Sequence, residues 1–190
     1  MIASPQPLRM TAEEYLEWES RQEIRYEFCD GEVVAMVGGT KGHNRAALNL
    51  YGALVGKVDA DDCEINVSDV KVLTGKGRFY RYPDLVVSCD ERDKNNDSFY
   101  EFPKLIVEVL SPGTEAVDRD DKFQEYIQIP TLEEYVLISA KRIQVERYRR
   151  GEGRMWLYFP YEAGDIIEIA SLNIEISIEQ LYRNVRLASV

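Results

Sequence analysis

The chain has 190 residues, of which 45% are hydrophobic, as in a soluble domain with a sizeable core. It has 34 acidic and 23 basic residues, a net charge of −11, which argues against a simple nucleic-acid binder because phosphate neutralisation is the main sequence-independent source of such affinity. No apolar run approaches the ~18 residues of a membrane span, and the N-terminus lacks the basic-then-apolar order of a secretory signal, so we expect a cytoplasmic protein without a transmembrane helix.

The first part of the chain predicts a helix, a hairpin and a second helix. Thr11 and Glu14 have the spacing of a capping box, so a short helix follows Thr11. Two strand-like runs flank the dipeptide Asp30-Gly31, which predicts a hairpin. The second helix begins after Gly42 and continues to about residue 58. Its apolar positions recur with helical period and predict one broad buried face: Ala46, Ala47, Leu50, Tyr51, Leu54, Val55 and Val58.

The remainder predicts strands around one further helix. Three strands are expected first, over residues 63–73, with a bulge or bend near Ser68, and over 79–88 and 103–111. A helix runs from about Asp118 to Ile129, and Pro130 ends it. A strand over 133–139 follows, and then a trailing antiparallel meander over 144–150, 155–159 and 165–169.

This order of elements predicts a mixed α/β fold. We expect one domain over residues 1–190, with a central mixed β-sheet flanked by helices and extra antiparallel strands at both ends. The middle strands carry nearly continuous apolar runs, which is typical of strands buried on both faces. Glu108 is the exception, because it places a carboxylate inside such a run.

Cysteine and histidine usage narrows the chemistry. Cys29, Cys63 and Cys89 are odd in number and widely spaced, and no CxxC motif occurs, so we expect reduced core thiols. His43 is the only histidine, which nearly excludes histidine-based zinc sites and Ser-His-Asp triads. Catalysis would therefore rest on carboxylates, lysine or tyrosine.

Glu108 has a candidate companion in Asp84. An ionised carboxylate in a buried strand must be paired, protonated, exposed at a strand end or bound to metal. Asp84 follows Pro83 at the front of the preceding apolar strand. If the strands are neighbours, both acids project from the same end of the sheet, and a divalent cation would relieve their repulsion. We expect the Val109 carbonyl as a further metal ligand; the alternative is a structural ion pair of Glu108 with Lys122 or Arg119.

The helix after Glu108 supplies a third group. At about 100° per residue, Phe123, Tyr126 and Ile127 form its inward side and Lys122 lies at the flank of that side. Two acids and one lysine are the parts needed for metal-assisted phosphodiester hydrolysis: the metal acidifies a bound water, and the ammonium orients that water or helps to deprotonate it. Tyr126 itself fits the buried stripe of the core.

Three further features are weaker candidates. Glu27 would add to the site unless it faces outward from its strand. His43, at a helix start, would contact a substrate phosphate or only satisfy backbone groups. The run Arg147–Arg150 is one place where DNA would bind, although such clusters are usually solvated hairpin edges.

Taken in order, several segments carry a resemblance to a known group of proteins. They are PDLVV, PKLIVEVLSP, DRDDKFQEY and IPTLEEYVLIS, together with TAEEYLEWE, YEFCDGEVV and His43 near the start. They resemble the PD-(D/E)XK nuclease superfamily, and more closely its cyanobacteria-rich Uma family of restriction endonucleases, over nearly the whole chain. The resemblance implies a restriction-endonuclease-like core, dependence on Mg²⁺ with Mn²⁺ as a substitute, DNA as the substrate class, and Asp84, Glu108 and Lys122 as catalytic residues.

One position departs from the superfamily pattern. That pattern has an acid, any residue and then a lysine on one strand, but here Leu110 stands at the position of the lysine. Lys122 would replace it from the helix, which its long side chain permits. Two function classes remain: a metal-dependent DNA endonuclease, and a non-catalytic or regulatory binding protein that keeps the fold. An enzyme that cuts both strands would most simply be a two-fold homodimer.

Overall fold

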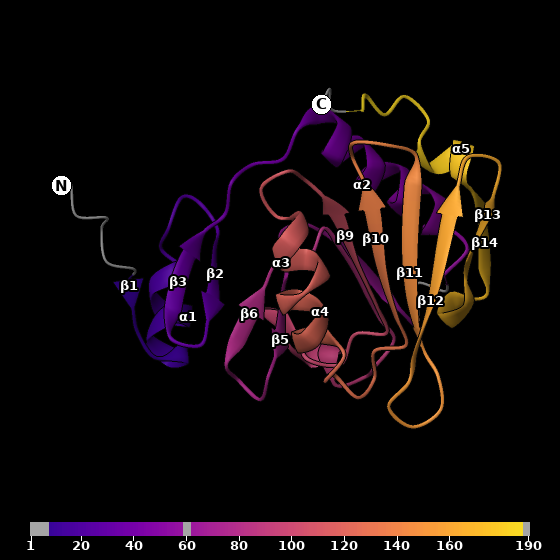
Figure 1. The fold of residues 1–190 in the computed structure, drawn as a ribbon. Coiled ribbons are helices and arrows are strands. Elements are labelled where there is room, and N and C mark those ends of the chain that lie inside the picture. Colours follow the sequence, from indigo (N-terminus) through magenta and orange to yellow (C-terminus); the bar gives the residue numbers. More distant parts are fainter. Residues whose placement is uncertain (1–7, 59–61, 188–190) are drawn as a thin grey trace.

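A computed structural model describes residues 8–58 and 62–187, which include two six-stranded sheets side by side (Figure 1). The sheet with the longer strands is called the larger sheet. The order of the strands is β12-β11-β10-β9-β7-β4. Strands β9 and β10 run parallel, and the other neighbours run antiparallel. The predicted central mixed sheet is thus confirmed. Its strands are β4 (Glu64–Val67), β7 (Leu85–Ser88), β9 (Leu105–Leu110), β10 (Glu134–Ser139), β11 (Gln144–Arg150) and β12 (Trp156–Glu162).

A second six-stranded sheet, with the order β1-β3-β2-β6-β5-β8 among the described residues, contains the N-terminal hairpin. The turn between β2 and β3 is formed by Asp30 and Gly31, both with positive φ, so the predicted hairpin is confirmed. Helix α1 (Ala12–Glu19) begins with the predicted capping box, in which Thr11 and Glu14 exchange hydrogen bonds. The strands are β1 (Leu8–Arg9), β2 (Tyr26–Cys29), β3 (Glu32–Ala35), β5 (Lys71–Thr74), β6 (Phe79–Arg81) and β8 (Phe99–Tyr100).

At two places where the sequence predicted a continuous strand, the chain crosses from one sheet to the other. Residues 63–73 form β4 and β5 in different sheets, and Ser68 between them has φ +65°. Residues 79–88 form β6 and β7 in different sheets, because Pro83 has no N–H to continue a ladder. The Ser68 N–H donates to the Asp84 carbonyl at 3.2 Å, which ties the two crossings together. Asp84 consequently lies where one sheet ends and the other begins.

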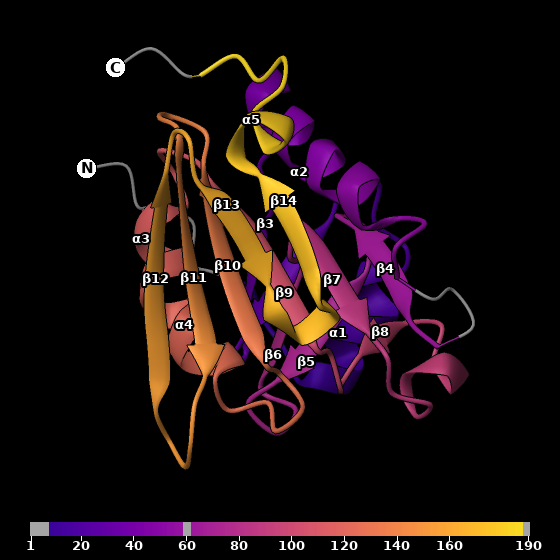
Figure 2. The same ribbon diagram turned by 90° about the vertical axis from the view of Figure 1, so that its right-hand side faces the viewer.

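Helices cover both faces of the larger sheet (Figure 2). Helix α2 (Lys41–Leu54) lies on one face with β13 (Ile166–Ile169), β14 (Ile174–Ser177) and α5 (Ile178–Leu181), and their apolar side chains share a core with β7, β9 and β10. Helices α3 (Glu115–Arg119) and α4 (Asp121–Tyr126) lie on the opposite face, over the second core. Strands β9 and β10 are buried along their whole length, as expected.

Several boundaries differ from the prediction. The helix expected from Asp118 to Ile129 is two short helices, because the backbone angles of Asp120, φ −115° and ψ −76°, depart from those of a regular α-helix. Helix α2 begins at Lys41 and ends at Leu54, so Val55 is half exposed and not part of the buried face. The meander ends at β12, since β13 pairs with β14 in a separate two-stranded sheet. Two 3-10 helices, η1 (Asp93–Asn95) and η2 (Ala170–Leu172), complete the described elements.

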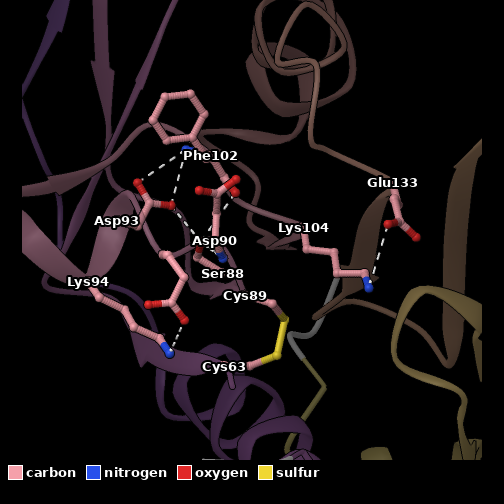
Figure 3. Close-up of a disulfide and its surroundings, with 10 residues drawn as sticks. Cys63, Ser88, Cys89, Asp90, Asp93, Lys94, Phe102, Lys104 and Glu133 are labelled. Carbon is pink, nitrogen blue, oxygen red and sulfur yellow. Dashed lines mark hydrogen bonds and ion pairs between the residues drawn. A yellow bond between two sulfur atoms is a disulfide. The ribbon is translucent and has the colours of Figure 1, made fainter. Parts of the chain in front are cut away.

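The prediction of three reduced thiols is wrong. Cys63 and Cys89 form a disulfide with a Cα–Cα distance of 4.0 Å (Figure 3), and Cys29 is a free thiol. The reason is strand pairing: Glu64 pairs with Ser88 in the antiparallel β4–β7 ladder, so the next residues outward face each other. Twenty-six positions separate the two cysteines in sequence, which is why their spacing gave no signal.

Among the described residues, no helix has the length and apolar character needed to cross a membrane. The expectation that the chain carries no secretory signal rests partly on residues 1–7, which lie outside the described part. The single domain over residues 1–190 stays a prediction.

Candidate active site

Asp84 and Glu108 are cross-strand neighbours. Leu85 pairs with Val107 in the antiparallel β7–β9 ladder, so the next pair is Asp84 with Glu108. The Val109 N–H donates to Asp84 Oδ2 at 2.7 Å, which holds the aspartate against β9. Asp84 lies at the front of β7, whereas Glu108 lies within β9, because the longer β9 continues past the start of β7.

Glu108 is paired with the lysine from the following helix. Lys122 Nζ lies 2.9 Å from Glu108 Oε1, and the Tyr126 hydroxyl donates to the same oxygen at 3.1 Å. Both members of the pair are buried, with Glu108 3% and Lys122 6% exposed. Burial raises the pKa of Glu108 well above its ordinary value, against the opposing charge of Lys122. Tyr126 is in the core, as the sequence indicates, and it also contacts the site.

Lys122 faces two further carboxylates. Its Nζ lies 3.1 Å from Asp118 Oδ1 and 3.5 Å from Glu27 Oε1. Burial acts to lower the pKa of Lys122, but Glu108, Glu27 and Asp118 together raise it well above its ordinary value. Carboxylates from β2, β9 and α3 thus converge on one ammonium, which stays protonated.

Asp118 is a site residue that sequence reasoning missed. It is 1% exposed, and among the described residues its Oδ1 has the contact with Lys122 but no hydrogen bond. Burial raises the pKa of Asp118, and Lys122 opposes that shift. The available signal was spacing, because Asp118, Lys122 and Tyr126 are four residues apart and so lie along one side of a helix.

Glu27 is buried in the site and does not face outward. The Tyr82 N–H donates to Glu27 Oε1 at 3.1 Å, and Arg81 donates to Oε2 at 2.9 Å. Arg81 also makes a two-pronged contact with Glu125, at 2.8 and 2.6 Å. Burial acts to raise the pKa of Glu27, but Lys122 and Arg81 outweigh it and lower that pKa. Arg81 and Glu125, both missed from sequence, thus connect the second sheet to α4.

His43 contacts Asp84 from the other side of the sheet. Its Nε2 lies 3.2 Å from Asp84 Oδ2. The cap of α2 is Thr40, whose side chain accepts a hydrogen bond from the His43 backbone N–H at 3.2 Å. Burial acts to lower the pKa of His43, but the hydrogen bond and charge of Asp84 and a hydrogen bond to the Val109 backbone raise it. His43 therefore positions Asp84 in addition to lying in the first turn of α2.

The donor set at the site suits a hard cation. Mg²⁺ usually takes one or two carboxylates and keeps several waters, and Asp84 and Glu108 supply two carboxylates from neighbouring positions of the β7–β9 ladder. Among the described residues, no group of three or more His, Cys, Asp and Glu side chains is arranged to hold a metal ion. The remaining ligands would thus be water or backbone oxygen, such as the predicted Val109 carbonyl. Asp118 Oδ1, buried without a hydrogen bond, is a further oxygen beside Lys122.

The arginine candidates have structural partners instead. Arg147 is 1% exposed and pairs with Glu134 and Glu168, so it is neither solvated nor available to DNA. Arg150 donates to three backbone carbonyls near the end of α4 and the loop after it. Arg119 pairs with carboxylates away from Glu108. The ion pair of Glu108 is therefore made by Lys122 and not by Arg119.

Comparisons with known proteins bear on the family and the fold of the chain. The model of the Uma2 family, described as "Putative restriction endonuclease", matches residues 12–180. One uncharacterized protein of Synechocystis sp. is 38% identical over 175 residues, which covers 92% of each chain; another is 35% identical over 150 residues and covers 78% of this chain and 85% of its own. The crystal structure of a "putative nuclease" from Anabaena variabilis has a TM-score of 0.74 at 16% identity, over 91% of this chain and 97% of the other.

Proposed function

The chain belongs to the Uma2 family, and from this premise we propose that it is a metal-dependent DNA endonuclease that hydrolyses phosphodiester bonds. The observation that carries the proposal is the 2.9 Å contact between Lys122 Nζ and Glu108 Oε1, beside Asp84. The lysine missing at Leu110 has a counterpart that reaches the same carboxylate from α4. The restriction-endonuclease-like fold supports the same reading.

The residues divide the work of hydrolysis between them. Asp84, Glu108 and the Val109 carbonyl would hold Mg²⁺, which when bound lowers the pKa of a water and stabilises charge at phosphorus. Lys122 holds a proton beside Glu108 and would orient the attacking water or stabilise the developing negative charge. Because the ammonium is buried among fixed carboxylates, its position is set before substrate arrives.

Side chains around the three central residues act as positioning groups. His43 and the Val109 N–H hold Asp84 Oδ2. The Tyr126 hydroxyl holds Glu108, and Asp118 holds the ammonium. These hydrogen bonds and ion pairs fix the side chains of Asp84, Glu108 and Lys122 within the surrounding apolar core.

A non-catalytic binding protein is the second candidate, and one observation favours it. The Glu108–Lys122 pair is almost fully buried, as in structural ion pairs that lack a catalytic role. In that case the buried carboxylates would only stabilise the fold, and the surface of the protein would bind a partner.

A cleavage assay separates the two candidates. Purified protein is incubated with supercoiled plasmid, linear duplex and single-stranded DNA at modest salt, with Mg²⁺, with Mn²⁺ or with a chelator. We expect nicking or cutting only with a divalent metal, and none by Asp84→Asn or Glu108→Gln. Glu115→Gln is the matched control, since Glu115 is partly exposed and pairs with Lys141 and Arg119 outside the site. Absence of metal-dependent cleavage on all three DNAs favours the binding protein.

Metal binding is tested without reference to activity. Titration calorimetry with Mn²⁺ should give one site in the wild type and a lost or weakened site in Glu108→Gln. Equal binding by both proteins contradicts ligation by Glu108.

The proposal includes a homodimer in the cytoplasm. Two copies related by a two-fold axis match the symmetry of duplex DNA and would cut both strands. Sedimentation velocity tests the dimer. The Cys63–Cys89 disulfide is unusual for a reducing compartment, so thiol trapping in cells tests the location together with the redox state.

A further inference from the structure

A basic groove lies beside the N-terminal half of α2. Its volume is about 630 Å³, and its polar lining consists of Lys41, Asn44, Arg45, Asn184 and Arg186. These side chains offer ammonium, guanidinium and amide donors, and no carboxylate is among the lining residues. The groove is thus a local exception in a chain with a net charge of −11.

The groove exists because the C-terminal segment packs directly on α2. Gly42 approaches Arg186 so closely that an added Cβ would lie 2.2 Å from the Arg186 carbonyl oxygen. Further along the helix, Asn49 Nδ2 donates to the carbonyls of Leu181 and Arg183, each at 2.8 Å. These contacts fix the segment that carries Arg186 against the helix that carries Lys41 and Arg45 (Figure 1).

The cations of the groove lack the partners that most other cations of this protein have. Arg81, Arg119, Lys122 and Arg147 each pair with two or more carboxylates. By contrast, Lys41, Arg45 and Arg186 of the groove and the neighbouring Arg183 are exposed, and none of them forms an ion pair with a residue that the structure describes. Four cations without an ion pair in the described part of the chain thus lie near one another at this end of the molecule.

The groove and the candidate active site are connected through α2. Lys41 and Arg45 each lie two residues from His43 on this helix, and His43 Nε2 lies 3.2 Å from Asp84 Oδ2. Resting on the proposed function, we propose that this groove binds the phosphate backbone of duplex DNA and leads one strand toward Asp84 and Glu108. Several phosphates along a strand would satisfy several separated cations, which a single small anion cannot do.

The groove also resolves a conflict in the charge of the chain. A protein this acidic repels DNA over most of its surface, so its binding must depend on a small set of phosphate contacts. The run Arg147–Arg150 does not supply them, because Arg147 and Arg150 have internal partners. The groove cations supply them.

Binding is tested with a fluorescein-labelled 30-base-pair duplex of mixed sequence, by anisotropy, in a chelator so that no cleavage occurs. The variant is Lys41→Ala/Arg45→Ala/Arg186→Ala. The slope of log K against log salt concentration is negative, and each lost phosphate contact reduces its magnitude by about 1. The slope of the triple variant should therefore be smaller in magnitude by about 3. At about 0.1 M salt its affinity should fall by roughly two orders of magnitude.

The matched control is Lys76→Ala/Arg149→Ala/Arg154→Ala, which removes the same charge. All three residues are exposed, without an ion pair among the described residues, and lie on hairpins distant from α2. Its salt slope should match that of the wild type. A charge-preserving variant, Lys41→Arg/Arg45→Lys/Arg186→Lys, should also keep the slope, and circular dichroism confirms that each variant is folded.

The outcomes separate this inference from the proposed function. Loss of binding in the groove variant alone supports the groove, whether or not the wild type cleaves DNA. Equal loss in both triple variants, or no loss in the groove variant, overturns it even if the wild type is a nuclease. Competition by poly-L-glutamate at lower concentration than by unlabelled duplex also overturns it, since the groove would then suit an acidic protein.

Discussion

Lys122 Nζ lies 2.9 Å from Glu108 Oε1, although the two residues come from a helix and a strand. Leu110, at the strand position where a lysine was expected, is 2% exposed and belongs to the apolar core that includes Tyr126. The strand position of Leu110 thus contributes to the core, and the following helix supplies the ammonium beside Glu108. As a result, the position of Lys122 relative to Glu108 depends on how α4 packs over β9.

Removing the ammonium should destabilise the protein as well as inactivate it. Lys122→Met leaves Glu27, Glu108 and Asp118 buried without their shared cation, which costs about 3–5 kcal/mol in the free energy of unfolding. Adding Glu108→Gln to this variant should restore part of the loss, because one uncompensated charge is removed. Urea denaturation measures both. Lys104→Met is the control, since Lys104 makes a partly exposed pair with Glu133 at 3.6 Å and should change stability by less than about 1 kcal/mol. Equal effects of Lys104→Met and Lys122→Met would contradict the buried network.

Replacing two glycines of α2 by alanine should change the stability of the protein in opposite directions. Gly42→Ala places a Cβ 2.2 Å from the Arg186 carbonyl oxygen, so it should lower stability by about 1–3 kcal/mol and weaken DNA binding by displacing Arg186. Gly52→Ala meets nothing within 4 Å and should raise stability by about 0.5–1 kcal/mol, since alanine suits a helix interior better. Thermal melts and the anisotropy assay give the readouts. Unchanged stability of the Gly42→Ala variant would show that the C-terminal segment is not packed on α2.

The disulfide should contribute measurably to stability. Closing a loop of 26 residues between Cys63 and Cys89 restricts the unfolded chain and is worth about 3–4 kcal/mol. Cys63→Ser/Cys89→Ser should therefore unfold at lower urea concentration than the oxidised wild type and no longer respond to reductant. Cys29→Ser should retain that response. Thiol titration of the denatured, oxidised chain should find one thiol, and three after reduction; three before reduction would contradict the bond.

Alkaline pH should weaken the fold through Cys29. Burial raises the pKa of its thiol to about 11 from an ordinary value of 9.0. Between those values the unfolded thiol has lost its proton while the folded thiol keeps it, so unfolding releases a proton and rising pH favours it. The stability contribution is complete below about pH 9 and is lost as pH rises through about 11. Denaturation of wild type and Cys29→Ala across this range should show a steeper decline in the wild type; parallel curves would contradict the shift.

Local signals in the sequence were sufficient for much of the fold. The capping box at Thr11, the turn at Asp30-Gly31 and the buried runs of β9 and β10 each depend on nearby residues, and each has the expected structure. The crossing at Pro83 was missed because two strands of opposite sheets adjoin without a loop, and their apolar residues read as one run.

Part of the candidate site could be predicted from the sequence for the same reason. Lys122 was visible because its place on the helix put it near the sheet, and Glu108 because it interrupts an apolar run. Arg81 was not visible, since its partners Glu27 and Glu125 come from elements distant in sequence. Asp118 has its partner Lys122 only four residues away, but a charged residue in the sequence gives no sign of its burial. The disulfide likewise depends on the pairing of β4 with β7, which only the folded chain displays.

The disulfide between Cys63 and Cys89 closes a covalent ring that contains β4, β5, β6 and β7 and passes through both sheets. Asp84 lies inside this ring, and Glu108 lies outside it. If the chain is pulled from its two ends, the ring bears no load along its interior, and about 90 Å of contour length stays hidden, at roughly 3.5 Å for each of 26 residues. Force would therefore separate the two carboxylates by extracting β9 from the sheet, while the segment that carries Asp84 keeps its covalent closure.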